Sequence, residues 1–118
     1  MYVAQPSPPD VVFEGDSRAI IRGFPKQVRE NFGGELQRLQ DAERPLDSKP
    51  LAPALPGVFE LRDGDKDLWY RVLYCVRGGV VYVLHCFTKK TKKTPQRDIE
   101  IGRKRLSDLK QRLAKQEK

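Results

Sequence analysis

Two runs of strand-forming residues, joined by a pair of glycines, constrain the fold of this chain more than any other feature. Residues 80–87 are mostly β-branched or aromatic, and residues 68–77 before them have a similar character. Gly78-Gly79 lies between the two runs and is typical of a two-residue hairpin turn, which favours residues that tolerate a positive φ. We therefore predict two adjacent antiparallel strands.

The turn also predicts which residues of the two strands face each other. If the turn has two residues, counting back from it places Arg71 opposite Cys86 and Val72 opposite His85. Residues directly opposite share a face of the sheet. Arg71 and His85 are therefore expected on different faces, unless a β-bulge intervenes.

An amphipathic helix is expected after this hairpin. Thr94-Pro95 is typical of a helix start, because threonine can cap a free backbone N–H and proline suits the first helical position. Apolar residues then recur at spacings of three and four, which places them on one face of a helix. This stripe consists of Ile99, Gly102, Leu106, Leu109 and Leu113.

Positive charge is concentrated at the junction between the strand and this helix. Residues 87–118 contain twelve Lys or Arg and four Asp or Glu, a balance of +8, which leaves −1 of the overall +7 for the rest of the chain. A solvated, lysine-rich helix would give a similar balance. However, four lysines cluster before the helix, where a hydrophobic strand ends, which favours a phosphate-bearing or acidic partner at this junction.

The first half of the chain predicts a short strand and two helices. Residues 11–13 are apolar and β-rich, and Asp16 or Ser17 can cap a short helix over residues 18–23. A second helix is expected after Pro25. Its apolar stripe consists of Val28, Phe32, Leu36 and Leu39.

Glycines and prolines divide the segment that follows. Gly33-Gly34 lies inside the second stripe, so this helix either breaks there or crosses closely against the sheet. Pro45 is expected to end the helix, and the prolines of residues 45–57 predict a surface loop. Residues 58–62 then alternate as another strand.

The composition indicates one globular domain. With 118 residues, 38% hydrophobic and 33% charged, the chain can build a single modest core, and no run approaches the ~18 apolar residues of a membrane span. Residues 1–10 are expected to form a flexible arm that is no secretory signal, with the domain over residues 11–115. Cys75, Cys86 and a single histidine do not form the usual zinc sets, so we expect no metal or cofactor, and reduced thiols in a cytoplasmic protein.

Three stretches, at residues 60–62, 69–74 and 84–95, combine arginines, aromatic residues and lysines in a recognisable order. The most specific part is Phe87 followed by Lys89-Lys90 and Thr94-Pro95. With the helix that follows, the chain resembles the phage-derived, HigB-like branch of the RelE/ParE toxins over roughly residues 11–113. The resemblance implies a RelE-like α+β fold, in which a small antiparallel sheet packs against two N-terminal helices, with a C-terminal helix.

The resemblance also implies a function, which is that of a toxin in a type II toxin–antitoxin system. Toxins of this branch are mRNA endoribonucleases that act on the ribosome, need no metal and inhibit translation. The implied partners are therefore the ribosome, mRNA and a cognate antitoxin, usually a helix-turn-helix protein. Attack of a ribose 2′-OH on phosphate needs a base, an acid and cations around the phosphorane. Cations are abundant here, whereas His85 is the only side chain that titrates near neutrality unaided.

The resemblance assigns roles to individual residues. Arg71 matches a phosphate-stabilising arginine of the family, and Lys89 and Lys90 match its basic pair after the last strand. The expected catalytic set is Arg62, Arg71, His85, Lys89 and Lys90. Contacts to the RNA backbone are expected from Lys92, Lys93 and Arg97. Lysines beyond a strand end are expected to lie outside the core and to bind phosphate.

Alternatives remain open for several of these residues. Arg71 also fits an ion pair with Glu60 or Asp67, and a lone histidine such as His85 is more often a satisfied core residue than a catalyst. Glu60 departs from related toxins, which can carry a basic residue on the equivalent strand. The alternative functions are a gyrase poison like the ParE branch and a basic RNA- or ribosome-binding module. The lysine cluster and His85 favour the HigB-like branch over the gyrase poison.

Overall fold

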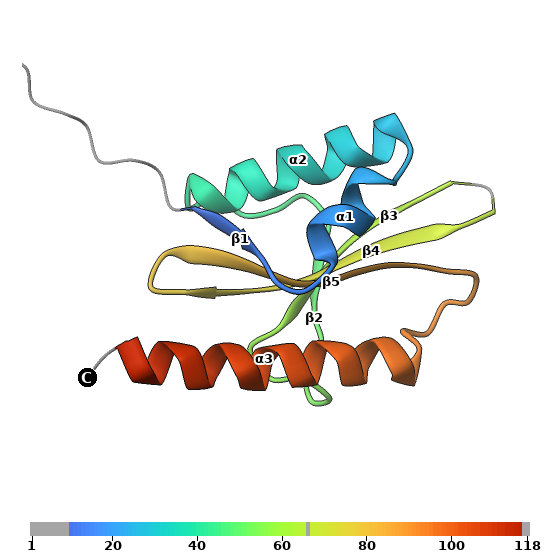
Figure 1. Cartoon of the computed structure of the whole chain (residues 1–118). Coiled ribbons are helices and arrows are strands. Elements are labelled where there is room, and N and C mark those ends of the chain that lie inside the picture. Colours follow the sequence, from blue (N-terminus) through green and yellow to red (C-terminus); the bar gives the residue numbers. More distant parts are fainter. Residues whose placement is uncertain (1–9, 66, 117–118) are drawn as a thin grey trace, which may run out of the picture.

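The chain forms three layers, with a sheet between helices. The computed structural model describes residues 10–65 and 67–116 (Figure 1). Its elements are β1 (Val11–Phe13), α1 (Ser17–Arg22), α2 (Lys26–Gln40), β2 (Ser48–Pro50), β3 (Phe59–Gly64), β4 (Trp69–Arg77), β5 (Val80–Lys89) and α3 (Gln96–Gln116). Figure 1 shows α1 and α2 on one face of the sheet and α3 across the other. The predicted α+β fold, with two N-terminal helices and a C-terminal helix, is confirmed. Of the expected N-terminal arm, residues 1–9 lie outside the described residues.

The sheet has the strand order β1-β5-β4-β3-β2. All neighbouring pairs are antiparallel except β1, which pairs in parallel with β5 at one edge. The predicted hairpin between β4 and β5 is confirmed, because Gly78 and Gly79 turn the chain with φ values of 58° and 78°. These positive angles explain why two glycines occupy the turn.

A β-bulge in β5 corrects the predicted register. Tyr74 pairs with Val83, as counting from the turn requires, but Leu73 pairs with His85, so Leu84 is the extra residue. Beyond the bulge Arg71 lies opposite Phe87 rather than Cys86. Because side chains alternate along a strand, Arg71 and His85 now lie on the same face of the sheet.

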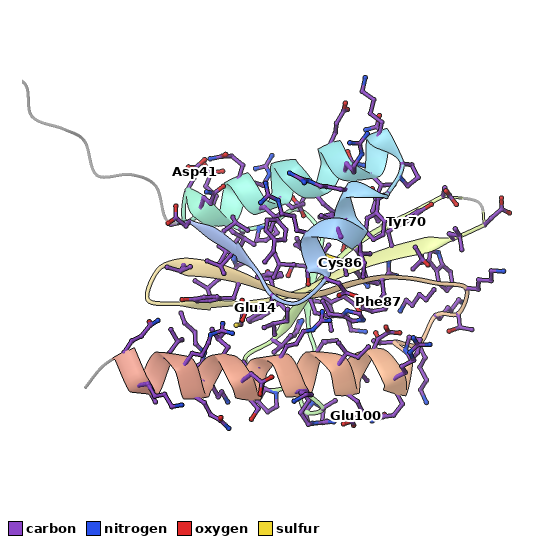
Figure 2. All side chains as sticks on the ribbon, viewed as in Figure 1. Glu14, Asp41, Tyr70, Cys86, Phe87 and Glu100 are labelled. Carbon is purple, nitrogen blue, oxygen red and sulfur yellow. The ribbon has the colours of Figure 1, made fainter. Side chains whose placement is uncertain are left out.

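Two apolar layers hold the helices on the sheet. On one face the predicted stripe of α2 packs with Leu61, Val72 and Val83. On the other face Leu106 and Leu109 of α3 pack with Leu73, Leu84 and Phe87. Figure 2 shows side chains filling both layers, and Glu100 on the outer surface of α3. The face that carries Arg71 and His85 is therefore the α3 face.

Several local expectations are wrong. The helix α2 continues through Gly33-Gly34, both exposed and with open space around them, so it neither breaks there nor crosses the sheet closely. It ends at Gln40 rather than at Pro45. The supposed loop at 45–57 contains β2, which pairs with β3 at the sheet edge, and Leu55, which is buried. An edge strand tolerates a proline, such as that of β2, because its outer N–H groups need no partner.

The predicted helix caps are also wrong, because Asp16 and Thr94 bond elsewhere and Ser17 is the first residue of α1 rather than its cap. Asp16 precedes α1 but makes no capping hydrogen bond, and its carboxylate pairs with Arg105 of α3 instead. The hydroxyl of Thr94 donates to Glu60 in β3. Both side chains therefore connect segments that are distant in sequence, and neither caps the helix that follows it. In the described part of the chain, no helix is long and apolar enough to cross a membrane.

Candidate functional site

Arg71, one of the expected site cations, is buried beneath the strand–helix junction. Its Nε lies 3.3 Å from Oε1 of Glu60, and its Nη1 donates to the carbonyl oxygens of Asp63 and Tyr70 at 3.0 and 2.8 Å. Burial lowers the pKa of the Arg71 guanidinium, and the Glu60 carboxylate opposes that shift. The ion pair with Glu60 that the sequence left open is therefore present. It ties β3 to β4.

Lys89 is also buried, with 5% of its surface exposed, so the expectation that it lies outside the core is wrong. The strand β5 continues through Lys89, whose Nζ donates to the carbonyl oxygen of Lys92 at 3.0 Å. Burial lowers the pKa of the Lys89 ammonium, against the attraction of Glu60. Lys89 thus holds the following loop in place.

Glu60, the residue that departs from related toxins, is the centre of this buried network. The residue is 3% exposed, and its carboxylate faces Arg71 with one oxygen. The other oxygen accepts the hydroxyl hydrogen of Thr94 at 2.8 Å. A buried carboxylate needs such partners. Glu60 therefore connects β3 to the segment that leads into α3.

His85 is held between two charged side chains. Its Nε2 lies 2.7 Å from Oδ1 of Asp98, and its Nδ1 lies 3.4 Å from Nη1 of Arg105. A guanidinium can only donate, so Nδ1 accepts and Nε2 carries the hydrogen given to Asp98. The same Nη1 of Arg105 donates to the carbonyl oxygen of Leu84 at 2.9 Å. His85 therefore links β5 to α3 through both ring nitrogens.

Arg105 extends these contacts to the turn before α1. Its Nη2 donates to Oδ1 of Asp16 at 2.8 Å, and this hydrogen bond lowers the pKa of the Asp16 carboxyl. Gly15 in the same turn has a φ of 56°, and a Cβ there would lie only 2.5 Å from the guanidinium carbon of Arg105. The positive φ therefore favours glycine here, and the absence of a side chain leaves room for the guanidinium of Arg105.

A cavity of about 380 Å³, which we name the His85 cavity, opens beside this pair. The strand β1 pairs with β5 only at residues 81–83, so the edge of β5 beyond them is left to α1 and α3. His85 and Thr88 of β5 line the cavity together with Arg97 and Asp98 of α3. It thus brings the sole histidine, a carboxylate and a guanidinium to one opening.

Four cations around this junction are exposed. They are Lys90, Lys92, Lys93 and Arg97. None makes an ion pair with a residue that the structure describes, and Arg97 lines the His85 cavity. Unpaired, solvated cations of this kind are free to bind phosphate oxygens. The exposure expected for Lys90 and the three RNA-binding candidates is therefore present.

Arg62 lies apart from the His85 cavity. Its Nε and Nη2 donate to Oδ1 of Asp47 at 2.9 and 2.8 Å, and its side chain is 40% exposed. With Arg71 it lines a second cavity of about 370 Å³, which we name the Trp69 cavity. Asp47, Asp63, Asp65 and Trp69 also line it. The expected catalytic set is therefore divided between two cavities and a buried network.

Sequence reasoning missed Asp98, Arg105 and Trp69. Asp98 and Arg105 belong to a helix rich in exposed charges, and nothing in their spacing marks them as partners of His85. The only available signal was the single histidine, whose burial requires hydrogen-bond partners. Cys75 and Cys86 are buried free thiols, and burial raises the pKa of Cys86 to about 12. Across residues 10–65 and 67–116, no group of three His, Cys, Asp or Glu is placed to hold a metal ion.

The comparison with protein families agrees with this architecture. The family model described as phage derived protein Gp49-like (DUF891) matches residues 19–107. The chain belongs to this family. The Gp49-like family is associated with toxins of the RelE/HigB type. No curated protein sequence matches this Gp49-like chain. The matched range includes every residue that lines the Trp69 cavity, and all those of the His85 cavity except Asp16.

Proposed function

We propose that this Gp49-like protein is the toxin of a type II toxin–antitoxin system of the HigB-like branch, with one toxin domain over residues 11–115. It inhibits translation by cutting mRNA on the ribosome without a metal. One observation carries the proposal. The sole histidine, a carboxylate 2.7 Å from it and Arg97 line one cavity beside exposed lysines. Acid–base groups next to cations are what cleavage by a ribose 2′-OH requires.

Asp98 is the proposed base of this reaction. Its Oδ1 is held by Nε2 of His85, and its other oxygen has no hydrogen-bond partner among the described residues. That oxygen takes the proton of the 2′-OH as the 2′-oxygen bonds to phosphorus. The bond from phosphorus to the 5′-oxygen breaks, and the leaving oxygen takes a proton from water. The products are a 2′,3′-cyclic phosphate and a 5′-hydroxyl end.

Arg97 and the exposed lysines supply the positive charge. Arg97 lines the cavity and offsets the charge that develops on the phosphorane. Lys90, Lys92 and Lys93 bind neighbouring phosphates and hold the strand at the opening. Lys89 acts indirectly, because its ammonium is used within the fold, and Arg71 does not line the His85 cavity.

Dependence on the ribosome follows from the small number of side chains that are left to catalyse the reaction. Only one histidine is present, and both of its ring nitrogens face protein groups. A catalyst of this kind gains most from a substrate that is already held in a reactive geometry. Ribosome-bound mRNA meets that requirement. Purified protein alone should therefore cut naked RNA poorly.

A second candidate is a basic RNA- or ribosome-binding module that blocks translation without cleavage. The contacts of His85 favour this second function. Both ring nitrogens are already bonded to protein side chains, so neither is free to accept a proton from a substrate. The burial of Lys89 and the place of Arg71 in a different cavity also favour it, since neither cation lines the His85 cavity. The two functions share a binding surface and differ only in whether a phosphodiester bond breaks.

Mapping new transcript 5′ ends after brief induction tests the proposal. The parent should stop translation and create 5′-hydroxyl ends. Asp98→Asn, which keeps the shape of the side chain, should remove those ends. Glu100→Gln is the matched control, because Glu100 lies on the outer surface of the same helix (Figure 2). Arrest without new ends would support the binding module, and cleavage by Asp98→Asn equal to the parent would exclude Asp98 as the base.

The proposed partner is a small antitoxin with a helix-turn-helix domain, encoded beside the toxin gene. An uncovered basic junction would bind nucleic acid throughout the cell, so this function requires a specific inhibitor. An antitoxin that is acidic where it meets residues 89–93 would associate faster through charge complementarity. Co-expression is the test, since the neighbouring product should co-purify with the toxin and restore growth.

A further inference from the structure

We propose that the Trp69 cavity is a stacking site for an unpaired nucleobase of bound RNA. This inference rests on the proposed function, because it names a binding site for the same substrate away from the reacting bond. The indole of Trp69 would support the base, and Arg62 and Arg71 would form the polar wall beside it. Stacking on aromatic side chains is how single-stranded RNA is held by proteins of many folds.

The position of the cavity suits such a site. Trp69 pairs with Lys89 across the β4–β5 ladder, so it adjoins the loop that carries the exposed lysines. Figure 1 shows the end of β3 and the start of β4 at the same end of the sheet as the loop between β5 and α3. A strand whose phosphates lie on Lys90 and Lys92 therefore has a base within reach of Trp69. Thr88, which pairs with Tyr70 beside Trp69, lines the His85 cavity.

The indole is held in position by the backbone of β3. A Cβ added to Gly64 would lie 2.7 Å from Cδ1 of Trp69, so the ring packs directly against a residue with no side chain. Trp69 remains partly exposed, and its Nε1 makes no hydrogen bond to the residues that the structure describes. A fixed, partly exposed aromatic ring with an unused donor loses little entropy on binding a base.

Arg71 contributes its guanidinium to the cavity wall, while its Nε is buried and faces Glu60. The residue is 8% exposed and lines the cavity, and its Nε has no well-aligned hydrogen-bond partner among the described residues. The oxygen of Glu60 lies 3.3 Å from that nitrogen, close enough for charge attraction. Arg62 lies directly opposite Arg71 on the neighbouring strand. Two guanidinium groups therefore lie side by side at this wall.

The carboxylates decide what kind of ligand fits. Asp47, Asp63 and Asp65 line the cavity with the two arginines, so an anion alone meets more negative than positive charge. A nucleobase is neutral and planar, and its edges carry both donors and acceptors. It can satisfy carboxylates and guanidinium groups at once. The cavity therefore takes the base, and the exposed lysines take the phosphate.

The sole tryptophan of the chain makes the test specific to this site. Titrating the intact protein with adenosine or guanosine monophosphate should quench Trp69 fluorescence, excited at the red edge of the indole band. Ribose 5-phosphate, which carries the phosphate without the base, should not quench it. Equal quenching by ribose 5-phosphate would show an anion site, and no quenching by either nucleotide would show no base site. Both results would overturn the proposal.

Variants extend the test to RNA. Trp69→Ala should bind a labelled single-stranded oligonucleotide roughly fivefold or more weakly, whereas Trp69→Phe should keep most of the affinity because it can still stack. Asp47→Asn should tighten binding by releasing Arg62. Arg29→Ala, which removes an exposed arginine of α2, is the matched control and should bind as the parent does.

The outcomes separate this inference from the proposed function. If the parent cuts mRNA but nucleotides do not quench Trp69 and Trp69→Ala binds RNA normally, the base site is absent and the enzyme remains. If nucleotides quench Trp69 but no transcript is cut, the base site stands and the cleavage proposal fails. The titration uses unmodified protein, so poor folding of a variant cannot decide the result.

Discussion

Lys89 and Lys90 are neighbours in sequence but have opposite environments. Lys89 is buried and bonded to the carbonyl oxygen of Lys92, whereas Lys90 is exposed and makes no ion pair with the described residues. Lys89 is the last residue of β5 and its side chain stays with the sheet, whereas Lys90 lies in the loop beyond the strand. A basic pair that looks uniform in sequence therefore contains one structural residue and one residue that can bind RNA.

This difference can be measured by the salt dependence of RNA binding. Lys90→Met should reduce the slope of log K against log salt by about 0.7, because one phosphate contact to a single strand is lost. Lys89→Met should leave the slope unchanged. The two variants remove the same charge from adjacent positions, so each is the control for the other. Equal slopes for the two variants would contradict the assignment.

The buried ammonium of Lys89 should also make stability depend on pH. Burial holds its pKa in the folded state below the ordinary value of 10.5. The unfolded chain therefore binds more protons between these two values, and the free energy of unfolding should rise with pH there. Lys89→Met should lack this rise. Urea unfolding of both proteins at several pH values up to about 10.5 is the measurement, and parallel curves would contradict the prediction.

At the scale of the elements, the bulge in β5 determines which residues meet. Leu84 and His85 are both ordinary strand residues, and neither marks the position of an extra residue. The bulge is stabilised by packing, since Leu84 and Phe87 both reach the layer beneath α3. Sequence periodicity predicts the hairpin, the helices and the apolar stripes because those signals are local. It could not predict the bulge because the packing partners are distant in sequence.

The distinction between local sequence signals and partners that are distant in sequence also explains the other differences between the predicted and the observed structure. The strand β2 has the sequence Ser48-Lys49-Pro50, which has little strand propensity, and it exists because β3 offers a partner. Charge clustering predicted the exposure of Lys90, Lys92 and Lys93, but it could not predict the burial of Lys89. The partners of His85 could not be predicted either, because Asp98 and Arg105 reach it only after α3 docks on the sheet.

The unbroken helix α2 gives a direct test of its two glycines. Gly33 and Gly34 are exposed, helical and surrounded by open space, so nothing in the fold requires them. Replacing each with alanine should raise the free energy of unfolding by about 0.5–1 kcal/mol. Urea denaturation gives the value. Gly64→Ala is the contrasting control and should destabilise the protein, because its Cβ would meet the indole of Trp69. A loss of stability in both α2 variants would show that these glycines have a role in packing.

At the scale of the whole molecule, Arg105 connects segments from both ends of the described chain. It bonds to Asp16 before α1, to the carbonyl oxygen of Leu84 in β5 and to the ring of His85. Arg112 forms a second ion pair across the same boundary, with Glu14. The layer of α3 is therefore held to the β1–α1 turn by charged contacts as well as by its apolar stripe.

Removing this connection should weaken the whole fold. Arg105→Met keeps most of the side-chain volume but loses the hydrogen bonds and leaves the carbonyl oxygen of Leu84 without its donor. We expect the free energy of unfolding to fall by about 1–3 kcal/mol. Lys104→Met is the control, because Lys104 is exposed and pairs only with exposed Asp108. Similar melting temperatures for the two variants would contradict the proposed role of Arg105.

The parallel pairing of β1 with β5 has a consequence for protein synthesis. Val11 cannot join the sheet until Val81 has left the ribosome, and the His85 cavity also needs residues of α3, which emerge later. A growing chain therefore exposes α1 and α2 before any complete cavity exists. If the protein cuts mRNA as proposed, it cannot attack its own message while β5 is still being made. An inhibitor that recognises the early elements could bind each new toxin before it becomes active.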